Sequence, residues 1–169
     1  MKRPYLVLTA LLFLFTAPGI VAYLVYTHPS WLRASTNRGH LLQPAPRLQS
    51  VGQHKKWQLL LWSPAGCDAQ CERRMNDLAR IRLSLGRRLY HVDIILAMPM
   101  TAPKISTALQ QQLRHDDARL LRMNAEDEQA LGLTAAVYIV NPAHDVILAY
   151  TPTQAEDDIF HDLKIVVKD

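Results

Sequence analysis

Residues 57–71, with the sequence WQLLLWSPAGCDAQC, join a short apolar run to a pair of cysteines. The run at 57–62 is almost continuously apolar, which is the pattern of a strand covered on both faces of a sheet. Proline and glycine in the next five residues predict a turn. From residue 70 to residue 85 apolar side chains recur at helical spacing, and Gly86 is the predicted stop of that helix. The stretch therefore predicts a strand, a turn that carries the first cysteine, and a helix that carries the second.

The rest of the chain adds strands and helices in a regular order. Strands are predicted at 92–97, 119–123, 135–140 and 146–150, and helices at 105–113, 126–131 and 155–167. Strand, helix, strand, helix, then a hairpin and a last helix is the order of a thioredoxin-like α/β fold, with a central mixed sheet flanked by helices. We predict that residues 57–169 form this domain. Residues 28–56, which prolines and glycines interrupt, are predicted as a linker and extended lead-in.

The composition fits one folded domain and an N-terminal segment. The chain has 169 residues, of which 49% are apolar and 20% charged, and this length suits a single domain. Two cysteines are too few for a scaffold built from disulfides. The net charge of +4 includes six arginines within residues 73–88, but no aromatic side chains alternate with them. We therefore interpret these arginines as a solvated helix face and expect no nucleic-acid partner.

The N-terminus carries the sequence signs of a membrane anchor. After the basic residues at 1–3, residues 4–27 contain no charged side chain. As a helix this run would be roughly 36 Å long, enough to cross the ~30 Å hydrocarbon core of a bilayer. It is longer than the apolar region of a cleaved signal peptide, and no convincing A-x-A cleavage site follows it. We predict a single-pass anchor in the lipid of a bacterial inner membrane, with residues 1–3 in the cytoplasm. The rest of the chain then lies in the periplasm, or in the equivalent mitochondrial intermembrane space.

Cys67 and Cys71 are the only cysteines, and they lie where the first predicted strand gives way to its helix. Sites form at the carboxyl ends of strands in open sheets, and a helix N-terminus favours the thiolate form of a cysteine. The arginines at 73–74 would add to this effect, whereas Asp68 and Glu72 oppose it. Because Cys67 is expected in the turn, its side chain can reach Cys71, which permits a disulfide or a two-thiolate site for a soft ion such as Cu(I). Two buried, inert cysteines are the alternative.

These residues resemble the SCO/SenC family of cytochrome c oxidase assembly proteins, and more closely its smaller SCO-like membrane proteins associated with bacterial oxidase assembly. The resemblance rests on the anchor, on residues 57–71, on STNRGHLLQP at 35–44 and on AAVYIVNP at 135–142. It implies an anchored thioredoxin fold that faces the periplasm or the intermembrane space. It also implies copper held by two cysteines and a histidine, and a role in maturing the dinuclear copper centre of the oxidase by copper delivery or thiol reduction.

The chain departs from that family at the third copper ligand. The family's cysteines correspond to Cys67 and Cys71, but Leu133 stands at the position of the histidine, which in the family directly precedes the strand that corresponds to residues 134–140. The proline that thioredoxins usually have before this strand is also missing. Met98 and Met100 follow the second predicted strand, and either is a candidate third ligand because thioethers bind Cu(I) well. Simple packing of the loop is the alternative for both. We interpret the scattered histidines as surface or hydrogen-bonding residues (His91, His115, His144 and His161).

Three functions are compatible with these features. The first is a SCO-like accessory factor for cytochrome c oxidase assembly, acting through Cys67 and Cys71 on copper or on the thiols of an oxidase subunit or another assembly factor. The second is a general periplasmic thiol-disulfide oxidoreductase. The third is a scaffold or binding module that kept the fold and lost the chemistry. Leu133 and the missing proline favour this third function, and the retained cysteine pair opposes it.

Overall fold

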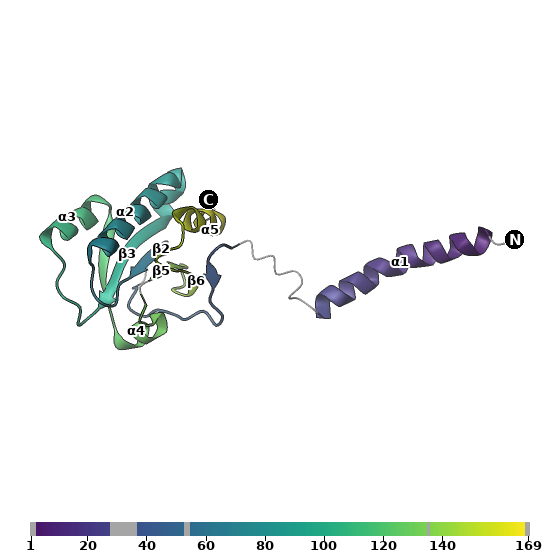
Figure 1. Ribbon diagram of the computed structural model, residues 1–169, viewed down its shortest axis with the longest axis horizontal. Coiled ribbons are helices and arrows are strands. Elements are labelled where there is room, and N and C mark those ends of the chain that lie inside the picture. Colours follow the sequence, from purple (N-terminus) through teal and green to yellow (C-terminus); the bar gives the residue numbers. More distant parts are fainter. Residues whose placement is uncertain (1–2, 28–36, 53–54, 135, 168–169) are drawn as a thin grey trace. The chain divides into compact units, whose positions relative to one another are not determined.

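The computed structural model describes residues 3–27, 37–52, 55–134 and 136–167 (Figure 1). The chain divides into two units, Met1–Thr36 and Asn37–Asp169. The first unit contains helix α1 (Arg3–Thr27), which covers the stretch predicted as an anchor. The side chains of residues 4–6, 8–10 and 25 in that stretch lie outside the described residues. No helix among the described residues combines the length and the apolar character that crossing a membrane requires.

A mixed sheet forms the centre of the second unit. Its strands are β1 (His40–Leu41), β2 (Trp57–Trp62), β3 (Val92–Pro99), β4 (Ala118–Met123), β5 (Ala136–Val140) and β6 (Val146–Tyr150). Over the described residues they lie in the order β1-β6-β5-β2-β3-β4. β3 is parallel to both β2 and β4, whereas β5 is antiparallel to β2 and β6, and β1 is antiparallel to β6. The predicted central mixed sheet is confirmed.

Helices connect the strands and cover the sheet (Figure 1). They are α2 (Ala69–Ser84), the 3-10 helix η2 (Gly86–His91), α3 (Thr107–His115), α4 (Ala125–Leu131) and α5 (Glu156–Val166). The four α-helices begin and end within two residues of the predicted positions. Gly86 has a φ of +62°, a conformation that ends α2 at the predicted stop. η2 was not predicted, and none of its residues is buried, so no apolar periodicity marks it in the sequence.

The core consists of two apolar clusters, one on each face of the sheet. Leu59 and Leu61 of β2 pack with residues of α2, α3 and α5. Leu60 and Trp62, which alternate with them, pack with α4 and with residues of the lead-in. All four side chains are at most 5% exposed. Because both faces of β2 are covered, its successive residues are apolar, and the predicted strand is confirmed.

The second unit begins at Asn37, within the stretch predicted as linker and lead-in. β1 lies in this stretch and pairs with β6, at the edge of the sheet. Further along the lead-in, Leu48 and Val51 are buried in the cluster that also contains Leu60 and Trp62. Residues 37–52 are therefore part of the folded domain.

Two buried aspartates hold the lead-in against the helices. Asp162 of α5 accepts hydrogen bonds from the backbone N–H groups of residues 38–39, at 2.8 and 2.7 Å. Asp127 of α4 accepts hydrogen bonds from those of residues 49–50, at 3.0 and 2.7 Å. Hydrogen bonds to a charged acceptor are stronger than those between neutral groups. They therefore compensate for the loss of hydration of these two buried carboxylates.

Candidate functional site

Hydrogen bonds fix the turn between β2 and α2. The backbone N–H of Ser63 donates to the carbonyl of Ala97 in β3 (3.0 Å), and the Ser63 hydroxyl donates to the carbonyl of Gly66 (2.7 Å). Gly66 has a φ of +98°, and a Cβ at this position would lie 3.2 Å from the Pro103 ring. The turn therefore requires glycine. This geometry places Cys67 shortly before the helix, as predicted.

Helix α2 begins with Asp68 as its N-cap residue. One carboxylate oxygen of Asp68 accepts hydrogen bonds from the backbone N–H groups of Gln70 (3.1 Å) and Cys71 (2.9 Å). N-cap residues of this type typically stabilise a helix by about 1 kcal/mol. The sequence-based interpretation treated Asp68 only as an acidic neighbour of the cysteines. An aspartate directly before a helical apolar pattern was the available signal for the cap.

Cys67 and Cys71 are joined in a disulfide, with their Cα atoms 5.1 Å apart. Since the chain has two cysteines, neither is a free thiol in this state. Cys71 is 8% exposed and belongs to the core cluster on the α2 face, whereas Cys67 is only partly buried. Cys67 is therefore the more accessible of the two residues to a partner molecule.

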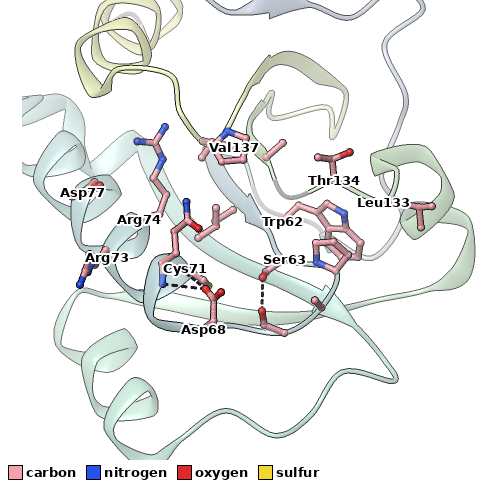
Figure 2. Close-up of a pocket in the computed structure, with 17 residues that line it drawn as sticks. Trp62, Ser63, Asp68, Cys71, Arg73, Arg74, Asp77, Leu133, Thr134 and Val137 are labelled. Atoms are coloured by element: carbon pink, nitrogen blue, oxygen red, sulfur yellow. Dashed lines mark hydrogen bonds between the residues drawn. The ribbon is translucent and has the colours of Figure 1, made fainter.

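A pocket of about 480 Å³ opens beside the disulfide (Figure 2). It is formed by the carboxyl end of β2, the cysteine turn, the first turns of α2 and the segment that leads into β5. Cys71 and Leu61 contribute to its lining, and Leu133, whose side chain is 94% exposed, stands at its rim. Pro152 was not predicted near the cysteines, because it is far from them in the sequence and only the fold brings it near. Leu133, by contrast, stands at the position for which the resemblance implies a histidine that shares a copper ion with the cysteines.

Four charged side chains also line the pocket, namely Asp68, Arg73, Arg74 and Asp77. Arg74 donates a hydrogen bond to the backbone carbonyl of Gln154, 2.9 Å away in the loop before α5. Figure 2 shows the side chain of Arg74 extending away from Asp68 and from Cys71 at the start of α2. Arg74 is therefore engaged with this loop, and the effect of the two arginines on a cysteine thiolate stays a prediction.

The candidate copper ligands lie in different environments. Met98 is fully buried in the core cluster that also contains Cys71, whereas Met100 lies beyond β3 and is 69% exposed. Leu133, at the position for which the resemblance implies histidine, is apolar and exposed. Within the part of the chain that the structure describes, no group of three or more His, Cys, Asp or Glu side chains is placed to hold a metal ion. The two sulfurs are joined to each other in the disulfide.

Three histidines that the sequence indicated as surface or hydrogen-bonding residues lie toward the opposite end of β2 from the cysteines. His91 immediately precedes β3, His115 ends α3 before β4, and His144 lies in the turn between β5 and β6. The fourth, His161 of α5, has its Nδ1 3.1 Å from a carboxylate oxygen of Asp162. These positions do not bring a histidine to the disulfide.

The fold and the cysteine pair define a thioredoxin-like protein with a disulfide at the carboxyl end of a central strand. The chain belongs to the family described as transmembrane-like, thioredoxin-like, C-terminal domain, whose model matches residues 57–168. No curated protein sequence matches the chain.

The fold is similar to those of several solved structures. Sco1 from Thermus thermophilus, solved in its apo form, is 18% identical, with 79% of this chain and 99% of that chain covered and a TM-score of 0.56. ScoI from Arabidopsis thaliana, solved with copper bound, is 12% identical, with 75% and 96% covered and a TM-score of 0.52. The bacterioferritin comigratory protein of Xanthomonas campestris, studied for alkyl peroxide reduction, is 12% identical, with 78% and 99% covered and a TM-score of 0.51. At these identities the likeness establishes a shared thioredoxin-like fold.

Proposed function

We propose that this chain is a thiol–disulfide exchange protein that assists the assembly of a respiratory oxidase. The observation that carries the proposal is the Cys67–Cys71 disulfide beside a pocket that can receive part of a partner chain. The SCO-like sequence features at 35–44, 57–71 and 135–142 support oxidase assembly as the process that the exchange serves. The partner is then an oxidase subunit or another assembly factor with two cysteines.

The exchange moves two electrons between the partner and the cysteine pair. In the oxidative direction, a partner thiolate attacks the sulfur of Cys67, the Cys67–Cys71 bond breaks, and Cys71 leaves with the electron pair. The second thiolate of the partner then attacks the partner's own sulfur in the mixed disulfide, which releases Cys67. The partner gains a disulfide, and the two protons of its thiols pass through water to Cys67 and Cys71. Reduction of a partner disulfide follows the same steps in reverse. The greater exposure of Cys67 assigns it the role of the attacked residue.

We propose further that residues 4–27 anchor the chain in a bacterial inner membrane, with the folded domain in the periplasm. The support is the lack of charged side chains in this segment and the basic residues at 1–3. An oxidising compartment also suits a chain whose two cysteines form a disulfide. Protease added to spheroplasts should digest the folded domain without lysis of the cells. Protection of the domain until lysis would contradict this location.

Copper delivery is a second candidate function, with copper as the cargo. The observation that favours it is the proximity of the two cysteines, since two thiolates suit Cu(I) once the disulfide is reduced. Titration of the reduced full-length chain with Cu(I) against a competing chelator tests it. Binding of one ion per chain that is lost in Cys67→Ser/Cys71→Ser supports copper delivery, and Met98→Leu then tests a third ligand. Equal, weak binding by both proteins excludes it.

Replacement of the cysteines in the source organism tests the exchange function. We expect Cys67→Ser/Cys71→Ser to abolish the assembly of active oxidase while the variant still accumulates in the cell. If the pair reduces a partner disulfide, Cys71→Ser alone should accumulate as a reductant-sensitive covalent complex with a subunit of the oxidase or an assembly factor, because Cys67 attacks the partner and no second thiol releases it; Cys67→Ser should not accumulate in this way. Normal oxidase assembly with the double variant would show that the chain acts as a scaffold and would overturn the proposal.

A further inference from the structure

Asp68 follows Cys67 and precedes Cys71 in the sequence, and it is the N-cap residue of α2. It accepts hydrogen bonds from the backbone N–H groups of Gln70 (3.1 Å) and Cys71 (2.9 Å). The second N–H group therefore belongs to one of the two disulfide-bonded residues. Asp68 is exposed and lines the same pocket as Cys71.

A carboxylate at this point opposes negative charge on the sulfurs. The N–H groups and the partial positive charge of a helix N-terminus favour a thiolate near that end. Asp68 takes up two of these N–H groups and adds a negative charge of its own. Among the described residues that line the pocket, the cations are Arg73 and Arg74, and Arg74 donates a hydrogen bond to the backbone carbonyl of Gln154 in the loop before α5. Figure 2 shows the Arg74 side chain extending away from Asp68. We therefore expect the Asp68 carboxylate to destabilise the anionic sulfur that forms when the disulfide opens.

We propose that Asp68 shifts the Cys67–Cys71 equilibrium toward the disulfide, so that the reduced pair donates electrons to a disulfide of the partner protein. An oxidoreductase whose reduced form is stabilised is a strong oxidant. Asp68 instead destabilises the reduced form of the Cys67–Cys71 pair, which makes the two thiols a stronger reductant. The inference rests on the proposed thiol–disulfide exchange and adds its direction. Asp68 acts here as a positioning residue, since it affects the sulfurs through the helix N–H groups and its charge.

The direction implies a defined sequence of bond changes. The thiolate of reduced Cys67 attacks one sulfur of the partner disulfide, which breaks and releases the first partner thiolate. Cys71 then attacks Cys67 in the mixed disulfide, forming the Cys67–Cys71 bond and releasing the second partner thiolate. Two electrons pass to the partner, and the two protons of the cysteine thiols reach the partner sulfurs through water. A dithiol reductant must reduce Cys67–Cys71 again before the next turnover.

Variants of Asp68 separate its charge from its role as a helix cap. Asp68→Asn and Asp68→Ser remove the charge but keep a side chain that caps helices well. Asp77→Asn is the matched control, because Asp77 lies on the same helix, lines the same pocket and pairs with Arg80 at 2.6 Å. Each full-length variant is equilibrated at one pH with mixtures of reduced and oxidised dithiothreitol, and its free thiols are counted after alkylation.

We expect Asp68→Asn and Asp68→Ser to raise the equilibrium constant for reduction by dithiothreitol about two- to fivefold, as expected for a charge at a helix end. High salt should shrink the difference from the unchanged chain because it screens an exposed charge. Asp77→Asn should leave the constant unchanged. An unchanged constant in both Asp68 variants, or a change no larger than that of Asp77→Asn, overturns the proposal. Because this equilibrium needs no partner protein, its result is independent of whether the chain serves an oxidase.

Discussion

The lead-in at 37–52 and the turn at 63–71 both use aspartates as acceptors for backbone N–H groups, but in different surroundings. Asp162 and Asp127, which bind the lead-in, are 0% and 1% exposed, and each accepts from two consecutive N–H groups. Asp68, at the turn, is exposed and accepts from a helix that also carries a disulfide-bonded cysteine.

Burial decides what each hydrogen-bonded carboxylate contributes. Removal of a buried acceptor leaves buried N–H donors without a hydrogen bond, which lowers the free energy of unfolding. When an exposed acceptor is removed, water takes its place as the hydrogen-bond partner. We therefore expect changes at Asp162 to affect mainly the free energy of unfolding. Changes at Asp68 should affect mainly the equilibrium of the disulfide.

The largest expected effect is that of Asp162→Ala. The substitution leaves the N–H groups of residues 38–39 and the hydroxyl of Tyr150 without their acceptor. We expect the free energy of unfolding, measured with urea on the full-length chain, to fall by about 3 kcal/mol or more. The control is Asp158→Ala, which removes an ion pair with Arg38 on the surface and should cost less than about 1 kcal/mol. Equal losses from the two variants would contradict the distinction between buried and exposed carboxylates.

The same carboxylate predicts how stability depends on pH. Burial raises the pKa of Asp162, but hydrogen bonds from Gly39, Arg38, His161 and Tyr150 outweigh burial and lower the pKa below its usual value. Because the pKa of Asp162 is lower in the folded chain than in the unfolded chain, its ionised carboxylate stabilises the folded state. This contribution to the free energy of unfolding is complete above the pKa of an aspartate in the unfolded chain, about 3.9. It is lost as the pH falls through the lower folded pKa. Urea midpoints measured between pH 7 and pH 2 should therefore fall more steeply at acid pH for the unchanged chain than for Asp162→Asn. Parallel curves would contradict this assignment.

A smaller effect is expected from Gly66→Ala in the cysteine turn. Alanine at a φ of +98° is strained, and its Cβ would lie 3.2 Å from the Pro103 ring, so we expect a loss of about 1–3 kcal/mol. Gly86→Ala is the comparison, since Gly86 has a φ of +62° but no atom within 4 Å of the added Cβ. Urea unfolding of the oxidised proteins should show the larger loss for Gly66→Ala. A larger loss for Gly86→Ala would mean that the contact with Pro103 does not constrain the turn.

The smallest expected effect is that of Ser63→Ala. It removes the hydrogen bond from a buried hydroxyl to the carbonyl of Gly66, and we expect a loss of about 1 kcal/mol. Ser84→Ala removes a hydrogen bond from an exposed hydroxyl to the carbonyl of Arg80 and should change stability very little. Thermal unfolding followed by circular dichroism distinguishes the two variants. Indistinguishable melting temperatures would show that the turn does not depend on this hydroxyl.

The sequence predicted the centre of the fold well, because periodicity reports burial directly. β2 is apolar at successive positions since both of its faces are covered, and α2 shows a helical apolar spacing since one of its faces packs on the sheet. The position of Cys67 in the turn follows from these two elements. The spacing of the two cysteines in the sequence permitted a disulfide but did not distinguish it from two free thiolates, because both arrangements require the two sulfurs to be close together.

The edges of the fold and the pocket could not be predicted in the same way. β1 is two residues long and carries no periodicity, and its place depends on pairing with β6 more than a hundred residues later. Met98 and Met100 are nearly adjacent in the sequence, yet one is buried and the other exposed because β3 extends through Pro99. Leu133 joins the pocket through the antiparallel pairing of β5 with β2, which brings the start of β5 to the end of β2.

Electron transfer to a peptide disulfide is the most direct test of the exchange function. The reduced full-length chain is mixed with a peptide that contains one disulfide, and the thiols gained by the peptide are counted over time. We predict that the unchanged chain reduces the peptide, that Cys71→Ser stops at a mixed disulfide through Cys67, and that Cys67→Ser reacts far more slowly. Reduction by the unchanged chain at no more than the rate of Cys67→Ser/Cys71→Ser would contradict thiol–disulfide exchange as the function of this site.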